Sequence, residues 1–111
     1  MTTSALSLRE LGAPLRALRL LATEHPHLPA PCVTVTDVYP DRLELALHDD
    51  LAAYEAWREA LGIAPGSVAC GEQSGGRTRV LTASVDYAGA RVRLVGYSRT
   101  AATAGAGEVA A

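Results

Sequence analysis

The residue types best suited to binding a metal lie in a proline-rich segment of this chain. His25 and His27 form one His-x-His pair, and Cys32 follows a few positions later. A structural zinc site takes four ligands in paired spacings, and the sequence offers no second pair to match the first. We therefore predict no metal site and no cofactor.

Covalent catalysis by a cysteine would require a thiolate with a base beside it. Cys70 falls in a short predicted strand with no visible base next to it. His48 precedes two aspartates, which we interpret as the end of a strand and the cap of a helix. Both cysteines are predicted to be reduced and buried as small hydrophobic residues. The chain is therefore predicted to be non-enzymatic, whereas an enzymatic or small-ligand domain would bring His48, Asp37 and Cys70 together in a pocket.

The clearest structural signal is a hairpin over residues 77–99. Two alternating runs of apolar and polar residues flank Ala88-Gly89, which we interpret as a two-residue turn. This register pairs Val80 with Tyr97. The face predicted to pack on the core carries Leu81, Ala83, Val85, Val92, Leu94 and Gly96.

The opposite face of the hairpin is the predicted interaction surface. It carries arginines on a solvated strand face, together with neighbouring apolar side chains that need a cover. A second subunit, another protein, or residues 1–12 folding back would supply that cover. The predicted surface consists of Val80, Val95, Tyr97, Arg91, Arg93 and Arg99.

Two helices are predicted ahead of the hairpin. The first has Pro14 in its opening turn and ends at His25, because a residue before proline is pushed out of helical angles. The second covers residues 51–61, where apolar residues recur at helical spacing. One of the two preceding aspartates caps it, and Gly62 ends it in a left-handed conformation.

Three further strands are predicted, around Val33–Val35, Leu43–Leu47 and residues 67–72. Alternation of apolar and polar residues marks the first two as half-buried. Their apolar faces match if Val35 lies opposite Leu45. That match requires an odd-length loop or a bulge between the two strands.

These elements predict a single α+β domain over residues 1–99, in the order α-β-β-α-β-β-β. Because short loops make neighbouring strands antiparallel, we expect an antiparallel five-stranded sheet with two helices on one face. Residues 1–12 contain a Ser7/Glu10 capping box and are ambiguous between a capped turn and a loosely ordered start. Residues 100–111 show no pattern that could bury a face, so they are predicted to form a disordered tail.

The charge of the chain is small overall and unevenly placed. A formal net charge of −2 argues against electrostatic binding of nucleic acid by the molecule as a whole. Residues 37–72 hold eight carboxylates and two arginines, whereas residues 77–99 hold five arginines and one aspartate. The sequence shows no apolar run long enough to span a membrane and no secretory signal. We expect a cytoplasmic protein without membrane association.

No motif in the sequence indicates one particular chemistry. We therefore base the predicted function on the predicted interaction surface of the hairpin. We expect a small protein-interaction domain that forms a homodimer, or binds another protein, through the outer face of the C-terminal hairpin. The acidic segment over residues 37–72 would complement the basic hairpin across such a dimer. One alternative is an accessory nucleic-acid-binding protein that uses the hairpin arginines. A second alternative is a small-ligand-binding domain.

Overall fold

A computed structural model of the chain describes residues 6–73, 75 and 78–99. The elements follow the predicted order of helix, two strands, helix and three strands, with two short 3-10 turns added. The expected tail over residues 100–111 lies outside the described residues. The helices are α1 (Gly12–Glu24) and α2 (Leu51–Leu61), and the 3-10 turns are η1 (Leu8–Leu11) and η2 (Pro65–Ser67). The strands are β1 (Cys32–Thr34), β2 (Arg42–His48), β3 (Ala69–Gln73), β4 (Thr78–Tyr87) and β5 (Ala90–Arg99).

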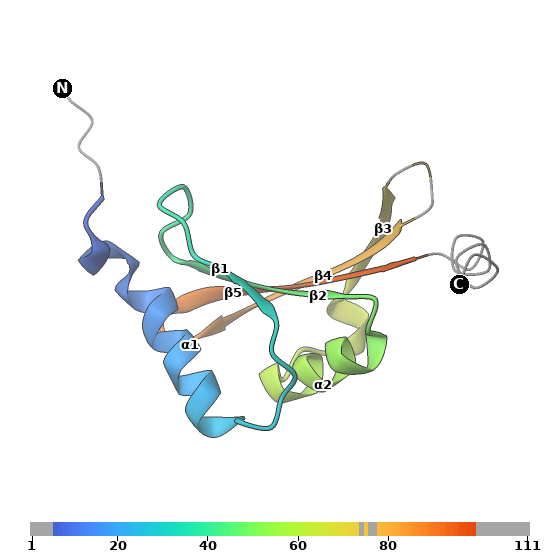
Figure 1. Ribbon diagram of the computed structural model, residues 1–111, viewed down its shortest axis with the longest axis horizontal. Coiled ribbons are helices and arrows are strands. Elements are labelled where there is room, and N and C mark those ends of the chain that lie inside the picture. The colour runs from blue at the N-terminus through green and yellow to red at the C-terminus, as the bar shows by residue number, and fades with distance from the viewer. Residues whose placement is uncertain (1–5, 74, 76–77, 100–111) are drawn as a thin grey trace.

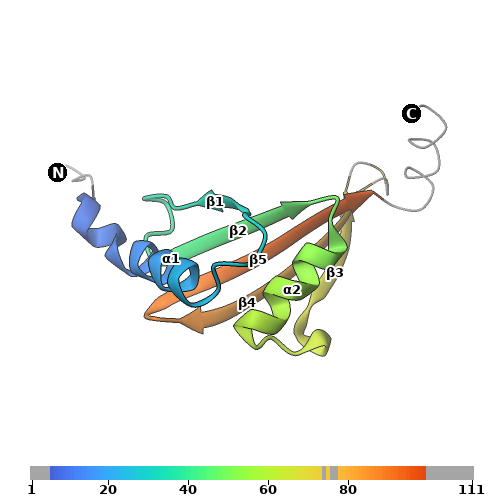
Figure 2. The same cartoon turned by 60° about the horizontal axis from the view of Figure 1, so that its bottom comes forward.

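All five strands form one mixed sheet in the order β1-β2-β5-β4-β3, and α1 and α2 lie on the same side of it (Figure 1, Figure 2). The β1-β2, β3-β4 and β4-β5 pairs are antiparallel, as expected. β2 and β5 are parallel neighbours, so the prediction of an all-antiparallel sheet was wrong at this pair. That prediction assumed short loops between neighbours, whereas α2, β3 and β4 separate β2 from β5 along the chain.

Burial explains why β5, and not β3, lies beside β2. β5 supplies Val92, Leu94 and Val95, each fully buried, so it requires neighbours on both sides. All five residues of β3 are exposed. The chain therefore places the strand with these fully buried residues in the middle of the sheet and a strand of exposed residues at the edge.

The β1–β2 pair keeps the expected match of faces in a different register. Val33 lies opposite Leu45, where we expected Val35, so the register is shifted by two residues. A shift of two leaves every side chain on its own face, because side chains alternate along a strand with a period of two. The connecting loop over residues 35–41 has an odd number of residues, as the matching of faces required.

The hairpin register is confirmed at every paired position. Ala88 and Gly89 both have positive φ angles, 52° and 85°, as a type I′ turn requires. Leu94 is fully buried on the predicted inner face, and Leu81 packs against the core from the same face.

The N-terminal elements end where the sequence signals predict. The Ser7/Glu10 capping box starts the short η1 turn, with the Glu10 carboxylate accepting the Ser7 N–H at 2.7 Å. α1 then ends ahead of the His25-Pro26 step. Among the described residues no helix is long and apolar enough to cross a membrane.

α2 is fixed at its start and through its largest side chain. Asp50 is the cap, and its Oδ1 accepts the Ala53 N–H at 2.9 Å. Gly62 ends the helix at a φ of 73°, as expected. Trp57 is buried and donates its indole N–H to the Pro29 carbonyl at 2.8 Å. The proline-rich link after α1 is thereby anchored to the second helix.

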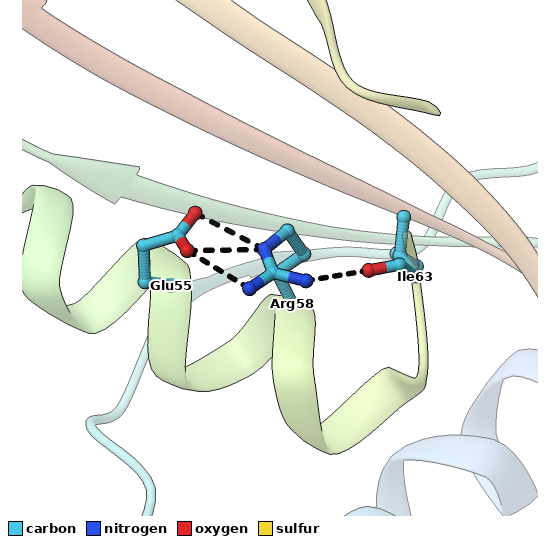
Figure 3. Close-up of polar contacts among 3 residues, drawn as sticks. All are labelled: Glu55, Arg58 and Ile63. Carbon is cyan, nitrogen blue, oxygen red and sulfur yellow. Dashed lines mark hydrogen bonds and ion pairs between the residues drawn. The ribbon is translucent and has the colours of Figure 1, made fainter. Parts of the chain in front are cut away.

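Arg58 fixes the exit of the chain from α2 (Figure 3). Its Nε and Nη2 donate to the Glu55 carboxylate over 2.9–3.1 Å, and its Nη1 donates to the Ile63 carbonyl at 2.7 Å. These hydrogen bonds from the guanidinium hold the pKa of the Glu55 carboxyl below its ordinary value. Because Ile63 leads into η2 and β3, this buried cation positions the edge strand of the sheet.

The helix layer and the sheet come closest where α2 crosses β5. Tyr54 is almost fully buried, and its ring lies directly over the backbone of Gly96. A Cβ atom at position 96 would come within 2.6 Å of the ring. The absence of a side chain at Gly96 therefore sets how closely α2 approaches the sheet.

Gly96→Ala is expected to lower the free energy of unfolding by about 2 kcal/mol, because the added methyl group overlaps the almost fully buried Tyr54 ring. Urea unfolding followed by the fluorescence of Trp57 measures the change. Gly71→Ala is the control, since a Cβ atom there meets nothing within 4 Å. Equal stability of the two variants would contradict the close contact.

Candidate functional site

The face of the sheet opposite the helices, here called the outer face, has no helix over it among the described residues (Figure 1). The β1–β2 loop and the end of β3 both rise on this side (Figure 1). Alternation along β4 and β5 directs every residue of the predicted interaction surface toward this face. The confirmed hairpin register therefore places those six residues together on one open surface.

The structure brings the three apolar residues of this surface side by side but buries one of them. Val80 lies opposite Tyr97, and Val95 is two positions from Tyr97 along β5. Val95 is 0% exposed, whereas Val80 and Tyr97 are half-buried. Val95 therefore forms the floor of the outer face, and the other two form its accessible part.

Neighbouring side chains of the same face explain the burial of Val95. Arg93 and Tyr97 flank it along β5, and both are held in place by partners on β2. The Tyr97 ring stacks on His48, with ring centroids 5.0 Å apart and an interplanar angle of 9°. This stack was not predicted, because only the parallel pairing of β2 with β5 sets His48 opposite Tyr97.

Each arginine of the predicted surface has a carboxylate partner. The closest pair is Arg93 with Glu44, whose Nη1 and Oε1 atoms are 2.7 Å apart and partly buried. Arg42 lies at 4.0 Å from the same carboxylate. The more exposed pairs are Arg91 with Asp86 at 3.0 Å and Arg99 with Asp49 at 3.8 Å.

The acidic and basic segments thus meet within one chain. We expected residues 37–72 to complement the hairpin across a dimer. The parallel pairing of β2 with β5 instead lays Glu44 and Asp49 beside the arginines of the same molecule. The outer face consequently carries nearly balanced charge.

An apolar rim borders the outer face on the β1–β2 loop. Val38 and Tyr39 are 71% and 53% exposed, and the Arg42 guanidinium lies 3.8 Å from the centre of the Tyr39 ring. A hollow of about 250 Å³ lies between this loop and β2. Val38 and Tyr39 were not among the predicted site residues, although two large apolar residues beside a Pro-Asp turn are a signal visible in the sequence.

A second hollow, of about 460 Å³, lies at the carboxyl end of the parallel pair β2 and β5. It is lined by His48, Asp49, Tyr97 and Arg99, and by residues of β3 and β4. Its polar groups bond to one another: the Asp49 N–H donates to the Tyr97 carbonyl at 2.6 Å, and the Asp49 carboxylate accepts the Arg99 N–H at 3.3 Å. These bonds join the ends of the two strands.

Both cysteines are exposed, so the prediction that they are buried was wrong. Cys32 lies on β1 and Cys70 on β3, the two edge strands of the sheet. With three strands between them, their separation is roughly 19 Å at about 4.8 Å per strand. This separation excludes a disulfide between them.

The residues considered for catalysis or ligand binding are not brought together. His48 is the last residue of β2, Asp37 lies in the loop before the other end of that strand, and Cys70 lies on the far edge strand. Within residues 6–73, 75 and 78–99, no three histidines, cysteines or carboxylates gather closely enough to hold a metal ion.

No protein-family model, curated protein or solved structure matches this chain. The outer face must therefore be interpreted from its own geometry and charge.

Glu44→Gln is expected to lower the free energy of unfolding by about 1 kcal/mol, because it removes a charge-assisted hydrogen bond to the partly buried Arg93. Urea unfolding measures the loss. Asp86→Asn is the matched control on the same face, since Asp86 and Arg91 are both largely exposed and an exposed ion pair contributes little. A larger loss for Asp86→Asn would contradict this ranking of the two pairs.

Proposed function

We propose that this chain is a protein-interaction domain that self-associates through its outer face. Val80 and Tyr97 form the centre of the contact, and Arg91, Arg93 and Arg99 surround them. The observation that carries the proposal is the uncovered outer face. Two helices bury one side of the sheet, while no described element covers the other (Figure 1).

The accessible side chains suit a protein contact. Tyr97 offers a large ring held by its stack on His48, so little rotamer freedom is lost when a partner covers it. Val95 beneath it supplies an apolar floor. Tyrosine and arginine are also enriched in protein interfaces relative to the rest of protein surfaces.

The charge pairing favours a protein over a phosphate backbone as the partner. A phosphate would have to displace Glu44 from Arg93, a pair that is already partly desolvated. A protein surface can cover such pairs without separating them. A second copy is the partner we propose, because two-fold homodimers are the commonest assembly of soluble proteins.

We also propose that the protein acts in the cytoplasm. Cys32 and Cys70 are exposed thiols that cannot pair with each other. Two free surface thiols fit a reducing compartment better than an oxidising one.

Tyr97→Glu is expected to weaken self-association at least tenfold, because it places a charge at the centre of the proposed contact. Light scattering coupled to gel filtration, over a range of protein concentrations, measures the mass. Arg79→Glu is the control, since it adds a carboxylate to an exposed position of β4 that points to the opposite face. A strict monomer at high concentration, or a mass unchanged by Tyr97→Glu, would overturn the proposal.

The alternative of a nucleic-acid-binding protein is favoured by one observation, the stacked rings of His48 and Tyr97 beside Arg99. We expect only weak binding of single-stranded DNA at low salt, since each arginine of the face already has a carboxylate partner. Fluorescence anisotropy with a labelled oligonucleotide, repeated as salt is raised, measures this. Tight binding that weakens steeply with salt would support the alternative instead.

A further inference from the structure

We propose a second contact between copies of this chain: β3 pairs antiparallel with β3 of a second copy about a two-fold axis at Gly71. This contact uses an edge of the sheet and goes beyond the proposed outer-face contact. Neither contact requires the other.

Among the described residues, no strand pairs with the outer edge of β3. All of its residues, Ala69–Gln73, are exposed. Proteins usually block such edges with charged side chains, lysine above all, or with proline, a bulge or a very short strand. β3, with the sequence Ala-Cys-Gly-Glu-Gln, has Glu72 as its one charged residue and no proline or lysine, and its pairing with β4 is continuous over five residues.

The other edge of the sheet, at β1, has two of these protective features. β1 is only three residues long, and Pro31 precedes it without an N–H to donate. One edge is therefore shortened and capped, while the other presents a full strand.

The alternation of hydrogen bonds in the sheet shows which backbone groups of β3 are free. The Arg91 N–H donates to the Asp41 carbonyl at 2.8 Å, and the Tyr97 carbonyl accepts the Asp49 N–H at 2.6 Å. Odd-numbered residues of β5 therefore direct their backbone groups toward β2. Because the direction alternates along a strand, even-numbered residues of β5 bond to β4.

The same alternation carries through to the edge. Val80 lies opposite Tyr97, so its backbone groups turn away from β5 and toward β3, where Gly71 is its partner. Cys70 and Glu72, on either side of Gly71, therefore direct their N–H and C=O groups away from the sheet. The two residues together present two N–H donors and two C=O acceptors along this edge.

The register that we propose for the second copy is centred on Gly71. With Gly71 opposite Gly71 of the second copy, each Cys70 faces the other copy's Glu72, and all the free groups form four hydrogen bonds. The two chains come closest at the axis, where glycine carries no side chain. No like charges lie directly opposite each other, whereas a register centred on Glu72 would oppose two carboxylates.

Disulfide trapping tests this register directly. In a Cys32→Ser, Cys70→Ser background, Gly71→Cys places the introduced thiols opposite each other, at a Cα separation of about 4.5–5.5 Å that suits a disulfide. A Cβ atom at position 71 meets nothing within 4 Å, so the fold is expected to tolerate the change. We expect Gly71→Cys to form a covalent dimer under mild oxidation at micromolar concentration.

Gln73→Cys in the same background is the matched control for random collision. Its side chain is also exposed and lies on the same face of β3. The two-fold axis at Gly71 sets it opposite Ala69 of the second copy, so its thiols are too far apart to bond. We expect its covalent dimer to form at least tenfold more slowly. Equal rates for the two variants, or no covalent dimer from either, would overturn the proposal.

Proline at an outward-facing position gives an independent test. Cys70→Pro removes an N–H that points away from β4, so the β3–β4 hydrogen bonds remain. In a Tyr97→Glu background, which removes the outer-face contact, we expect a tenfold or greater loss of association by sedimentation equilibrium, with Cys70→Ser unchanged in the same background. Far-ultraviolet circular dichroism checks the fold. An unchanged association of a folded Cys70→Pro variant would also overturn the proposal.

These outcomes are separable from those for the outer face. Tyr97→Glu is expected to leave the trapping of Gly71→Cys unchanged, because residue 97 lies two strands from the edge. Trapping that persists while Tyr97→Glu leaves the mass unaltered would support the edge contact alone. If a different protein occupies this edge, the Gly71→Cys variant will form no covalent dimer while the chain still binds that protein. This result would contradict the proposal of a second copy as the occupant.

Discussion

The burial of β5 is the constraint on which the rest of this structure depends. Val92 and Leu94 are fully buried on the helix side of the strand, and Val95 is fully buried on its outer side. The strand must therefore lie between two others and beneath the helices. The tight turn at Ala88-Gly89 supplies β4 as one neighbour. The other neighbour must be the apolar β2, and the direction of the chain then makes that pair parallel.

The parallel pair also decides the character of the outer face. It sets Glu44 beside Arg93 and His48 beside Tyr97, so that charges are paired and rings are stacked across two segments far apart in sequence. The charge separation visible along the chain therefore largely cancels in the folded molecule. These paired charges around a tyrosine support our proposal of a protein partner over a polyanion.

Local signals in the sequence were sufficient for the elements and for the hairpin. Pro26, Asp50, Gly62 and the Ala-Gly turn each mark a boundary through a backbone preference that needs no tertiary information. The order of strands depends instead on which ones must be buried on both faces. The exposure of the two cysteines could not be predicted for the same reason, because it depends on which strands become the edges of the sheet.

The candidate surface was predictable only in part for the same reason. Alternation along one hairpin identified which side chains share a face, and that assignment was correct. The partners of those side chains come from β2 and from the β1–β2 loop, so the stack at His48 and the rim at Tyr39 could not be derived from the hairpin alone.

The close approach of Tyr54 to Gly96 has a consequence for the opposite side of the sheet. Gly96 immediately precedes Tyr97, so the buried ring of Tyr54 supports, from the helix side, the strand that carries the half-buried ring of Tyr97 on the outer face. A displacement of that backbone would compress the helix layer. We infer that this backbone resists displacement, so that the docking proposed above would require little reorganisation of the surface.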